Sequence, residues 1–148
     1  MTTDLDTIAM LRDSLERYSA DRYSFLQRAP LLRQRIGGFE LRFMALQEVA
    51  YQAVQAMGEG RDNGGEASLI KIRGTELYQD VAQALVEALG PAGIAFDSAA
   101  LHSATLPPLG PDDSGGILKE HFYNRAATIF GGSSEIQRNI VAKVVLGL

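Results

Sequence analysis

Apolar residues recur three and four positions apart through most of this 148-residue chain, and this spacing restricts its fold more than any other feature. It places the apolar side chains on one face of an α-helix, whereas a half-buried strand would require strict alternation. The longest such series consists of Leu32, Ile36, Phe39, Phe43, Leu46, Ala50, Ala53 and Met57. A series of this kind is typical of the seam between helices in a bundle. We therefore predict an all-α fold, an antiparallel, up-and-down helical bundle of four to five helices.

Helix start and stop signals divide the chain into segments. A first helix precedes Pro30, which suits the first position of a second helix because its missing N–H would be unpaired there anyway. A turn rich in Gly, Asp and Asn over residues 58–65 separates the second helix from a third, which ends before Gly90. We expect residues 1–29 to form an N-terminal helix and residues 30–148 to form the bundle, the two packing as one domain.

The remaining helices follow from the same pattern. The third helix is apolar on more than one side, so we expect it to be covered on more than one side. A fourth helix is predicted over about residues 117–130 and a last helix over about residues 135–146. The residues that these two helices are expected to bury are Leu118, Phe122, Ile129, Ile136, Ile140, Val141, Val144 and Leu148. Within the second helix, Gly37 and Gly38 indicate either a close approach of a neighbouring backbone or a kink.

The composition excludes several classes of function. The chain has no Cys, so it has no disulfide, thiolate metal site or thiol nucleophile. Its two histidines, His102 and His121, lack a metal-ligand spacing, and we expect no metal site. Asp112 and Asp113 have the surroundings of a solvated turn. A formal charge of -4 argues against a surface that binds duplex nucleic acid.

The same composition bears on localisation. No apolar run approaches the 18 or so residues that indicate a membrane span, and the acidic N-terminus does not resemble a secretory signal. We expect a cytoplasmic protein with neither nucleic acid nor a membrane as a partner.

Residues 130–138, with the sequence Phe-Gly-Gly-Ser-Ser-Glu-Ile-Gln-Arg, form the sharpest local motif. Two glycines allow another group to approach the backbone, and the helix start that follows presents free N–H groups at the positive end of its dipole. Such a place suits a phosphate or pyrophosphate. The alternative is an interhelical turn in which Ser134 and Gln137 form a capping box. The residues alone leave both interpretations open.

Residues 122–148 closely resemble the C-terminus of acyl-CoA dehydrogenases, flavoproteins that oxidise acyl-CoA thioesters to enoyl-CoA. Residues 66–77 and 86–93 are similar to the preceding helix and turn of that family, and most similar to its bacterial branch associated with steroid and other bulky acyl-CoA substrates. Residues 11–23 resemble the opening helix of the family. The central β-domain, which lies between these parts in a full-length member, has no counterpart in the chain.

The resemblance implies two contacts with FAD, often across a subunit interface. The residues that match the first contact are Glu87, Ala88, Leu89 and Gly90. The residues that match the second contact are Gly132, Ser133, Ser134 and Glu135. Glu87 stands where the family usually has Gln, and Pro91 stands where it usually has Gly.

In many members a carboxylate directly before the second glycine of this turn removes the α-proton of the substrate. Here that position is Gly131, so we identify no catalytic residue in the chain. The resemblance thus implies an acyl-CoA dehydrogenase-like FAD component that is inactive alone. It would work as a homo-oligomer or with a fuller acyl-CoA dehydrogenase subunit, and acyl-CoA would bind only in that intact context. The alternative is a non-catalytic, self-associating helical bundle that binds no nucleotide.

Overall fold

The computed structural model describes residues 30–61, 64–89 and 114–148, and every regular element in these residues is helical. The elements are α3 (Pro30–Gly58), α4 (Gly64–Leu89), α7 (Ser114–Asn124), the short 3-10 helix η2 (Arg125–Thr128) and α8 (Ser134–Leu146). The all-α prediction is confirmed. The expected N-terminal helix, Gly90, His102, Asp112 and Asp113 lie outside the described residues.

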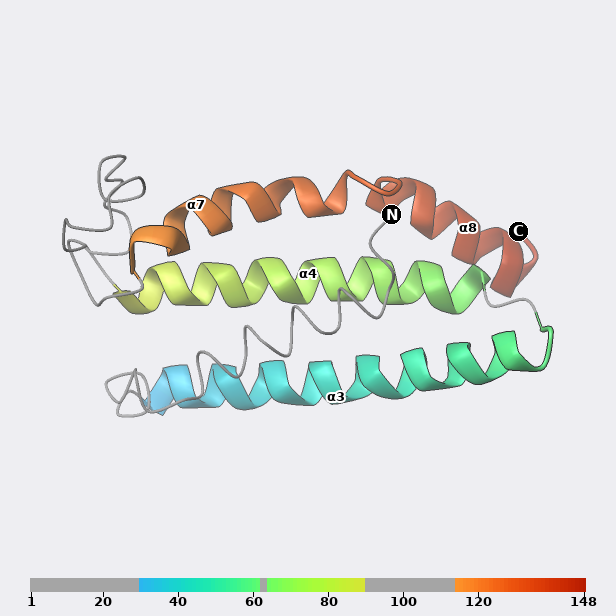
Figure 1. Cartoon of the computed structure of the whole chain (residues 1–148), viewed down its shortest axis with the longest axis horizontal. Helices are drawn as coiled ribbons and strands as arrows, with labels where there is room; N and C mark the ends of the chain where they lie inside the picture. The colour runs from blue at the N-terminus through green and yellow to red at the C-terminus, as the bar shows by residue number, and fades with distance from the viewer. Residues whose placement is uncertain (1–29, 62–63, 90–113) are drawn as a thin grey trace.

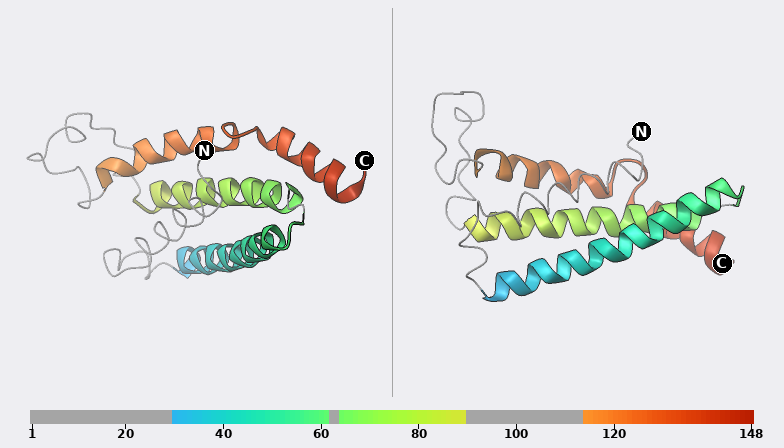
Figure 2. Two further views of the ribbon diagram at one scale, coloured as in Figure 1. Left: turned by 45° about the vertical axis from the view of Figure 1, so that its right-hand side comes forward. Right: turned by 60° about the horizontal axis from the view of Figure 1, so that its bottom comes forward.

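Helix α4 is the centre of the described fold. It packs against α3 on one side and against α7 and α8 on the other (Figure 1). Both α3 and α7 run antiparallel to α4. After η2 the chain continues into α8 in the same general direction, so α7 and α8 lie end to end and form a third row (Figure 2). The prediction that the third helix of the sequence is covered on more than one side is therefore confirmed.

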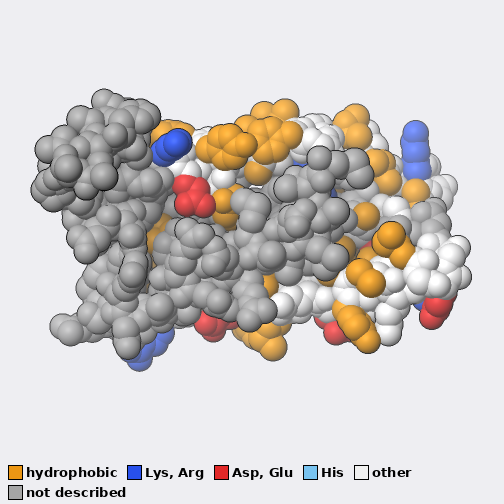
Figure 3. All heavy atoms as spheres, in the orientation of Figure 1, with side chains coloured by type: hydrophobic (Ala, Val, Ile, Leu, Met, Phe, Trp, Pro, Cys, Tyr) orange, Lys and Arg blue, Asp and Glu red, His pale blue; other side chains and the backbone are white. Residues whose placement is uncertain are grey.

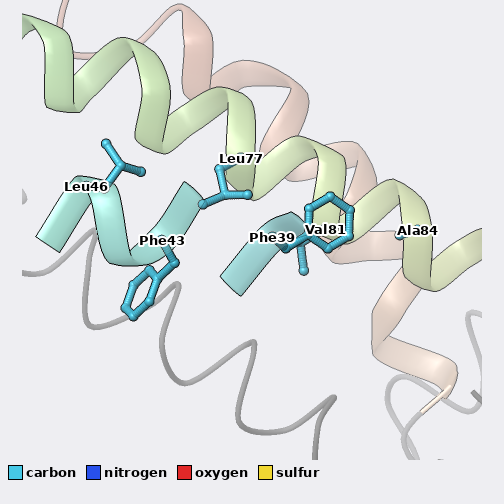
Figure 4. Close-up of a cluster of buried hydrophobic side chains, with 6 residues drawn as sticks. All are labelled: Phe39, Phe43, Leu46, Leu77, Val81 and Ala84. Carbon is cyan, nitrogen blue, oxygen red and sulfur yellow. The ribbon is translucent and has the colours of Figure 1, made fainter. Parts of the chain in front are cut away.

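The core lies along the contact between α3 and α4. Its main cluster consists of Phe39, Phe43, Leu46, Leu77, Val81 and Ala84 (Figure 4). Two smaller clusters are formed by Ala50, Ala53 and Ile70, and by Leu85, Val86 and Leu118. The apolar series predicted for α3 is confirmed from Phe39 to Ala53, where its members are buried. Met57 at the end of α3 is 64% exposed, so its predicted place in the seam is wrong.

Two ion pairs specify the antiparallel register of α3 and α4. Arg42 Nη1 lies 2.7 Å from Asp80 Oδ2, and Arg35 pairs with Glu87. Because the arginines are seven residues apart and so are the acids, the two pairs lie one heptad apart along the contact. All four side chains are about half exposed, so these pairs contribute more to register than to stability.

Helices α7 and α8 bury fewer side chains than the sequence predicts. Leu118 is buried, and Ile140 and Val141 are half-buried. The residues that expose half or more of their surface are Phe122, Ile129, Ile136, Val144 and Leu148. Their predicted burial is wrong because each short helix contacts α4 through one face, and no described element covers the opposite face. None of the described helices is long and apolar enough to span a membrane.

The helix boundaries near the C-terminus also differ from the prediction. The predicted fourth helix divides, because α7 ends at Asn124 and η2 follows it. The last helix begins at Ser134, one residue before the predicted start.

Gly65 lies where the end of α8 meets the start of α4. A Cβ added at Gly65 would lie 2.6 Å from Val145 Cγ2, far inside a normal packing distance. In contrast, no described atom lies within 4 Å of a Cβ added at Gly37 or Gly38. The close approach that the sequence suggested at these two glycines is not found within the described chain.

We predict opposite effects of alanine at Gly65 and Gly37. Gly65→Ala should lower the free energy of unfolding by about 1–3 kcal/mol, because overpacking forces α8 away from α4. Gly37→Ala should raise it by about 0.5–1 kcal/mol, because alanine loses less backbone entropy inside a helix. Urea unfolding followed by circular dichroism measures both changes. Effects of the same sign would contradict the packing described at these two sites.

Candidate functional site

The turn between η2 and α8 is built on two glycines with positive φ. Gly131 has a φ of 69° and Gly132 a φ of 95°, values that residues with a side chain rarely adopt. Gln137 Nε2 donates to Gly131 O at 3.1 Å, and Ser134 Oγ donates to Thr128 O at 3.5 Å. The first turn of α8 therefore holds in place the segment that precedes it.

Ser133 is the N-cap of α8. Its backbone is extended, and its hydroxyl oxygen accepts a hydrogen bond from Ile136 N at 3.5 Å, as is usual for a capping serine. The predicted capping box is wrong. Ser134 is already helical and buried, and the Gln137 side chain turns back to Gly131.

Glu135 occupies the positive end of α8. Its carboxylate accepts hydrogen bonds from its own backbone N–H and from the Ser133 hydroxyl, and these bonds, together with nearby Arg138, hold its pKa below the ordinary value. A negative charge in this first turn is also favoured by the helix dipole. An incoming phosphate would compete with the Glu135 carboxylate for the N–H of Glu135 and with the Ser133 hydroxyl for the N–H of Ile136.

Two polar side chains of α4 fix the chain just before the turn. Lys71 Nζ donates to Ala127 O at 2.9 Å, and partial burial lowers the pKa of Lys71. Gln79 Nε2 donates to Asn124 O at 2.9 Å. Both bonds satisfy carbonyls at a helix end, where intrahelical donors are lacking. Sequence reasoning did not assign this role, because each bond joins residues more than 40 positions apart and no local pattern identifies the partner.

An exposed network of ion pairs attaches α8 to the middle of α4. Glu76 accepts from Arg138 of α8 and from Arg73 of its own helix, each at 3.1 Å. Arg138 also lies 3.9 Å from Glu135. The negative charges of Glu76 and Glu135 are therefore neutralised by the positive charges of Arg73 and Arg138 next to the start of α8.

The residues of the other expected FAD contact lie at the C-terminal end of α4. The Glu87 carboxylate pairs with Arg35 of α3 and accepts a bond from Gln83 Nε2 at 2.8 Å. These two bonds hold the pKa of Glu87 below its ordinary value. Ala88 is half-buried, and Leu89 is the last residue of α4. The Glu87 side chain thus joins two helices of its own chain.

The two expected contacts do not converge within one chain. The first turn of α8 is attached at Glu76, and Glu87 follows eleven residues later on the same helix. At 1.5 Å per residue, this separates them by roughly 16 Å along α4. The two sets of expected contact residues therefore lie at separate places along α4.

Among the described residues next to the glycine turn, each carboxylate already has hydrogen-bond or ion-pair partners. Gly131 has no side chain, and the nearby Glu135 and Glu76 are engaged as described above. In the described ranges no group of three His, Asp or Glu residues could hold a metal ion. The arrangement can bind and orient an anion, whereas it lacks a group to remove a proton from carbon.

The lowered pKa of Glu87 predicts a loss of stability in acid. A carboxyl group whose pKa is lower in the folded state contributes its full stability above the unfolded pKa of about 4.3, and loses it as the pH falls through the lower folded value. The free energy of unfolding of Glu87→Gln should therefore fall below that of the wild type by at most about 1 kcal/mol at neutral pH, since the pair is half exposed. Urea unfolding from pH 7 to pH 3 should show this difference disappearing below about pH 4. If the free energies of unfolding of the wild type and of Glu87→Gln differ by the same amount at every pH, the ionised Glu87 carboxylate does not stabilise the fold.

A family model described as "Acyl-CoA dehydrogenase, C-terminal domain" matches residues 5–146. Over 119 residues the chain is 29% identical to acyl-CoA dehydrogenase IpdE1 of Mycolicibacterium smegmatis and 28% identical to IpdE1 of Mycobacterium tuberculosis. Each alignment covers 80% of this chain, but only 26% and 27% of the two relatives. The chain therefore spans about a quarter of the curated relatives that it matches.

Solved structures show the same fold. The structure titled "Tcur3481-Tcur3483 steroid ACAD" superimposes with a TM-score of 0.70 at 24% identity, over 97% of this chain and 34% of that chain. The ChsE4-ChsE5 complex from Mycobacterium tuberculosis gives a TM-score of 0.65 at 20% identity, over 97% of this chain and 35% of that chain. The row of helices around α4 is thus an arrangement already known from larger proteins.

Proposed function

This chain belongs to the family of acyl-CoA dehydrogenase C-terminal domains, and on that premise we propose that it is the helical component of an FAD-dependent enzyme. The reaction of such an enzyme introduces a double bond between the α and β carbons of an acyl-CoA thioester. Bound FAD would supply the acceptor for a hydride from the β-carbon. The similarity to IpdE1 and to a steroid acyl-CoA dehydrogenase supports a bulky acyl group as the substrate.

The observation that carries this proposal is the glycine turn before α8. Gly131 is exposed, with no described atom within 4 Å of an added Cβ, and Ser133 and Ser134 begin a helix whose positive end faces that turn. Backbone N–H groups at such a helix start bind phosphate oxygens. The residues present therefore suit the pyrophosphate of FAD, and Glu135 competes with it for the same donors.

We also propose that a second subunit completes the site. Because Gly131 leaves no carboxylate at the position of the family's base, a fuller acyl-CoA dehydrogenase subunit would remove the α-proton. The ChsE4-ChsE5 structure is an example of two differently named chains that form a complex in a similar fold.

Flavin retention tests the proposed function. The purified chain should be mixed with FAD alone, and with FAD and a full-length acyl-CoA dehydrogenase subunit from the same genome, before gel filtration. We expect yellow flavin absorbance to co-elute with the chain only when the subunit is present. Colourless chain in mixtures with every such subunit would count decisively against a flavin role.

The charge of Glu135 should limit the affinity of the site for FAD. Glu135→Gln removes the competing negative charge and keeps a similar shape, so the dissociation constant of FAD in the reconstituted assembly should fall by about three- to tenfold. Fluorescence titration of FAD measures this change. Glu59→Gln, which alters another exposed acid in the turn between α3 and α4, is the matched control and should leave the dissociation constant of FAD unchanged. A weaker affinity in Glu135→Gln would show that the carboxylate assists binding.

A second candidate function is a self-associating bundle that binds no nucleotide. Two observations favour it. Glu135 occupies its own N–H and Ser133 occupies the N–H of Ile136, two donors that a phosphate would need. Several large apolar side chains of α3, α7 and α8 are also exposed. Sedimentation of the purified chain without flavin separates the two candidates, because only self-association predicts a stable oligomer in that sample.

A further inference from the structure

The segment between α7 and α8, residues 125–133, contains no buried residue. Within it, Ile129 and Phe130 are 66% and 50% exposed. Apolar side chains are visible along the outer edge of the α7–α8 row (Figure 3). Because burial of apolar surface is the dominant force that fixes one element on another, and this segment buries little, its position depends mainly on its polar bonds.

Two side chains of α4 bind the carbonyls of this segment and of the residue before it. Lys71 Nζ donates to Ala127 O at 2.9 Å. Gln79 Nε2 donates to Asn124 O at 2.9 Å and lies 3.3 Å from Arg125 O. Lys71 and Gln79 are eight residues apart, which is roughly 12 Å along α4. They therefore hold the chain at two separate points.

The Lys71 bond lies close to the glycine turn in the chain. Thr128, the residue after Ala127, accepts a bond through its carbonyl oxygen from Ser134 Oγ of α8 at 3.5 Å. Residues 129–133, which include both glycines of the turn, therefore lie between a bond to α4 on one side and the first residue of α8 on the other. A shift of Ala127 relative to α4 would move this turn.

The charge of Lys71 suits its place. Its ammonium group meets a carbonyl of η2, and the C-terminal end of a helical segment carries a partial negative charge. A hydrogen bond from an ionised donor is also stronger than one between neutral groups. Partial burial lowers the pKa of Lys71, which agrees with an ammonium group that has exchanged part of its water for this carbonyl.

We propose that Lys71 and Gln79 are positioning residues for FAD, because they fix the glycine turn in the position in which it binds the nucleotide. This inference rests on the flavin role proposed above and names side chains that control it. They act through the carbonyls of Ala127 and Asn124 and not by contact with the flavin. A turn that occupies its binding position for only a fraction of the time binds more weakly in proportion to that fraction.

Titration of FAD into two variants tests this inference. Lys71→Met and Gln79→Met each keep an unbranched side chain and remove the donor. Each should raise the dissociation constant of FAD in the reconstituted assembly at least about fivefold, the effect of one ordinary hydrogen bond on the population of the binding position. The control is Phe43→Leu, which weakens the contact between α3 and α4. It should lower the stability of the fold and leave the dissociation constant of FAD unchanged.

A spin label reports on the same segment in the absence of flavin. The chain has no cysteine, so Ile129→Cys carries a single label directly after η2. Met44→Cys carries a single label on α3, where the native side chain is 62% exposed. In the chain alone, Lys71→Met should make the label at position 129 more mobile, which narrows its electron paramagnetic resonance lines. The same change should leave the label at position 44 unaffected.

The two measurements separate failure of this inference from failure of the proposed function. If the wild-type chain retains no FAD with any full-length acyl-CoA dehydrogenase subunit, the proposed function fails and the inference falls with it. If the wild type retains FAD and both variants bind it equally tightly, or Phe43→Leu weakens binding as much as they do, the inference alone is overturned. An unchanged label at position 129 in Lys71→Met would also overturn it, since Lys71 would then not hold the segment.

Discussion

Leu77→Ala should lower the free energy of unfolding by about 2–5 kcal/mol, because it removes a large side chain from a fully buried place. Leu77 is 0% exposed and belongs to the cluster that joins α4 to α3 through Phe39 and Phe43. Domains of this size are stable by only about 5–15 kcal/mol. The variant should therefore lose a large fraction of its stability, which urea unfolding followed by circular dichroism will measure.

Leu31→Ala is the control for this prediction. Leu31 lies in the first turn of α3 and is 78% exposed, so the same change in side chain should alter stability by no more than about 0.5 kcal/mol. Equal losses in the two variants would show that the contact between α3 and α4 is not the core of this fold.

Gly132→Val should weaken FAD binding to the reconstituted assembly at least tenfold, or about 1.4 kcal/mol. Valine disfavours a φ of 95°, and a Cβ there would lie 2.7 Å from Gln137 Nε2. Backbone strain of this kind costs about 1–3 kcal/mol and would open the turn that presents the start of α8. Fluorescence titration with FAD measures the affinity.

Gly60→Val is the control for Gly132→Val, because it introduces similar backbone strain at a turn that is not expected to contact FAD. Gly60 has a φ of 72° in the turn after α3, with no described atom within 4 Å of an added Cβ. Its replacement should lower stability by a similar 1–3 kcal/mol or so and leave the FAD affinity unchanged. If both variants weaken FAD binding equally, the glycine turn before α8 has no specific role in it.

The sequence predicts the long helices well because their spacing and their ends are local signals. The seam through Phe39, Phe43 and Leu46 requires only that one face of α3 be buried, and Pro30 marks the first residue of that helix. The start of α8 was also predictable, since the two glycines before Ser133 adopt the positive φ that only glycine tolerates easily.

The burial on α7 and α8 could not be predicted from periodicity. Phe122 and Ile136 have the spacing of core residues, yet each is more than half exposed. Periodicity identifies an apolar face but does not tell whether that face meets a helix of its own chain or one of another chain. The side-chain bonds of Lys71 and Gln79 join residues more than 40 positions apart, so no local pattern predicts them.

The division of the chain at residue 30 stays a prediction. The family model for the C-terminal domain matches residues 5–146, a stretch that includes all of residues 11–23, which were compared above with the family's opening helix. A chain cut before Pro30 would show whether residues 1–29 contribute to folding.

Substrate turnover tests most directly the claim that this chain supplies a flavin contact and depends on another subunit for the base. Dehydrogenation of a steroid acyl-CoA should be followed with an electron acceptor for the chain alone and for the assembly with a base-bearing subunit. We expect turnover only in the assembly, and a decrease of about 10²- to 10⁴-fold when the carboxylate of that subunit is replaced by an amide. Turnover by the chain alone would contradict the account.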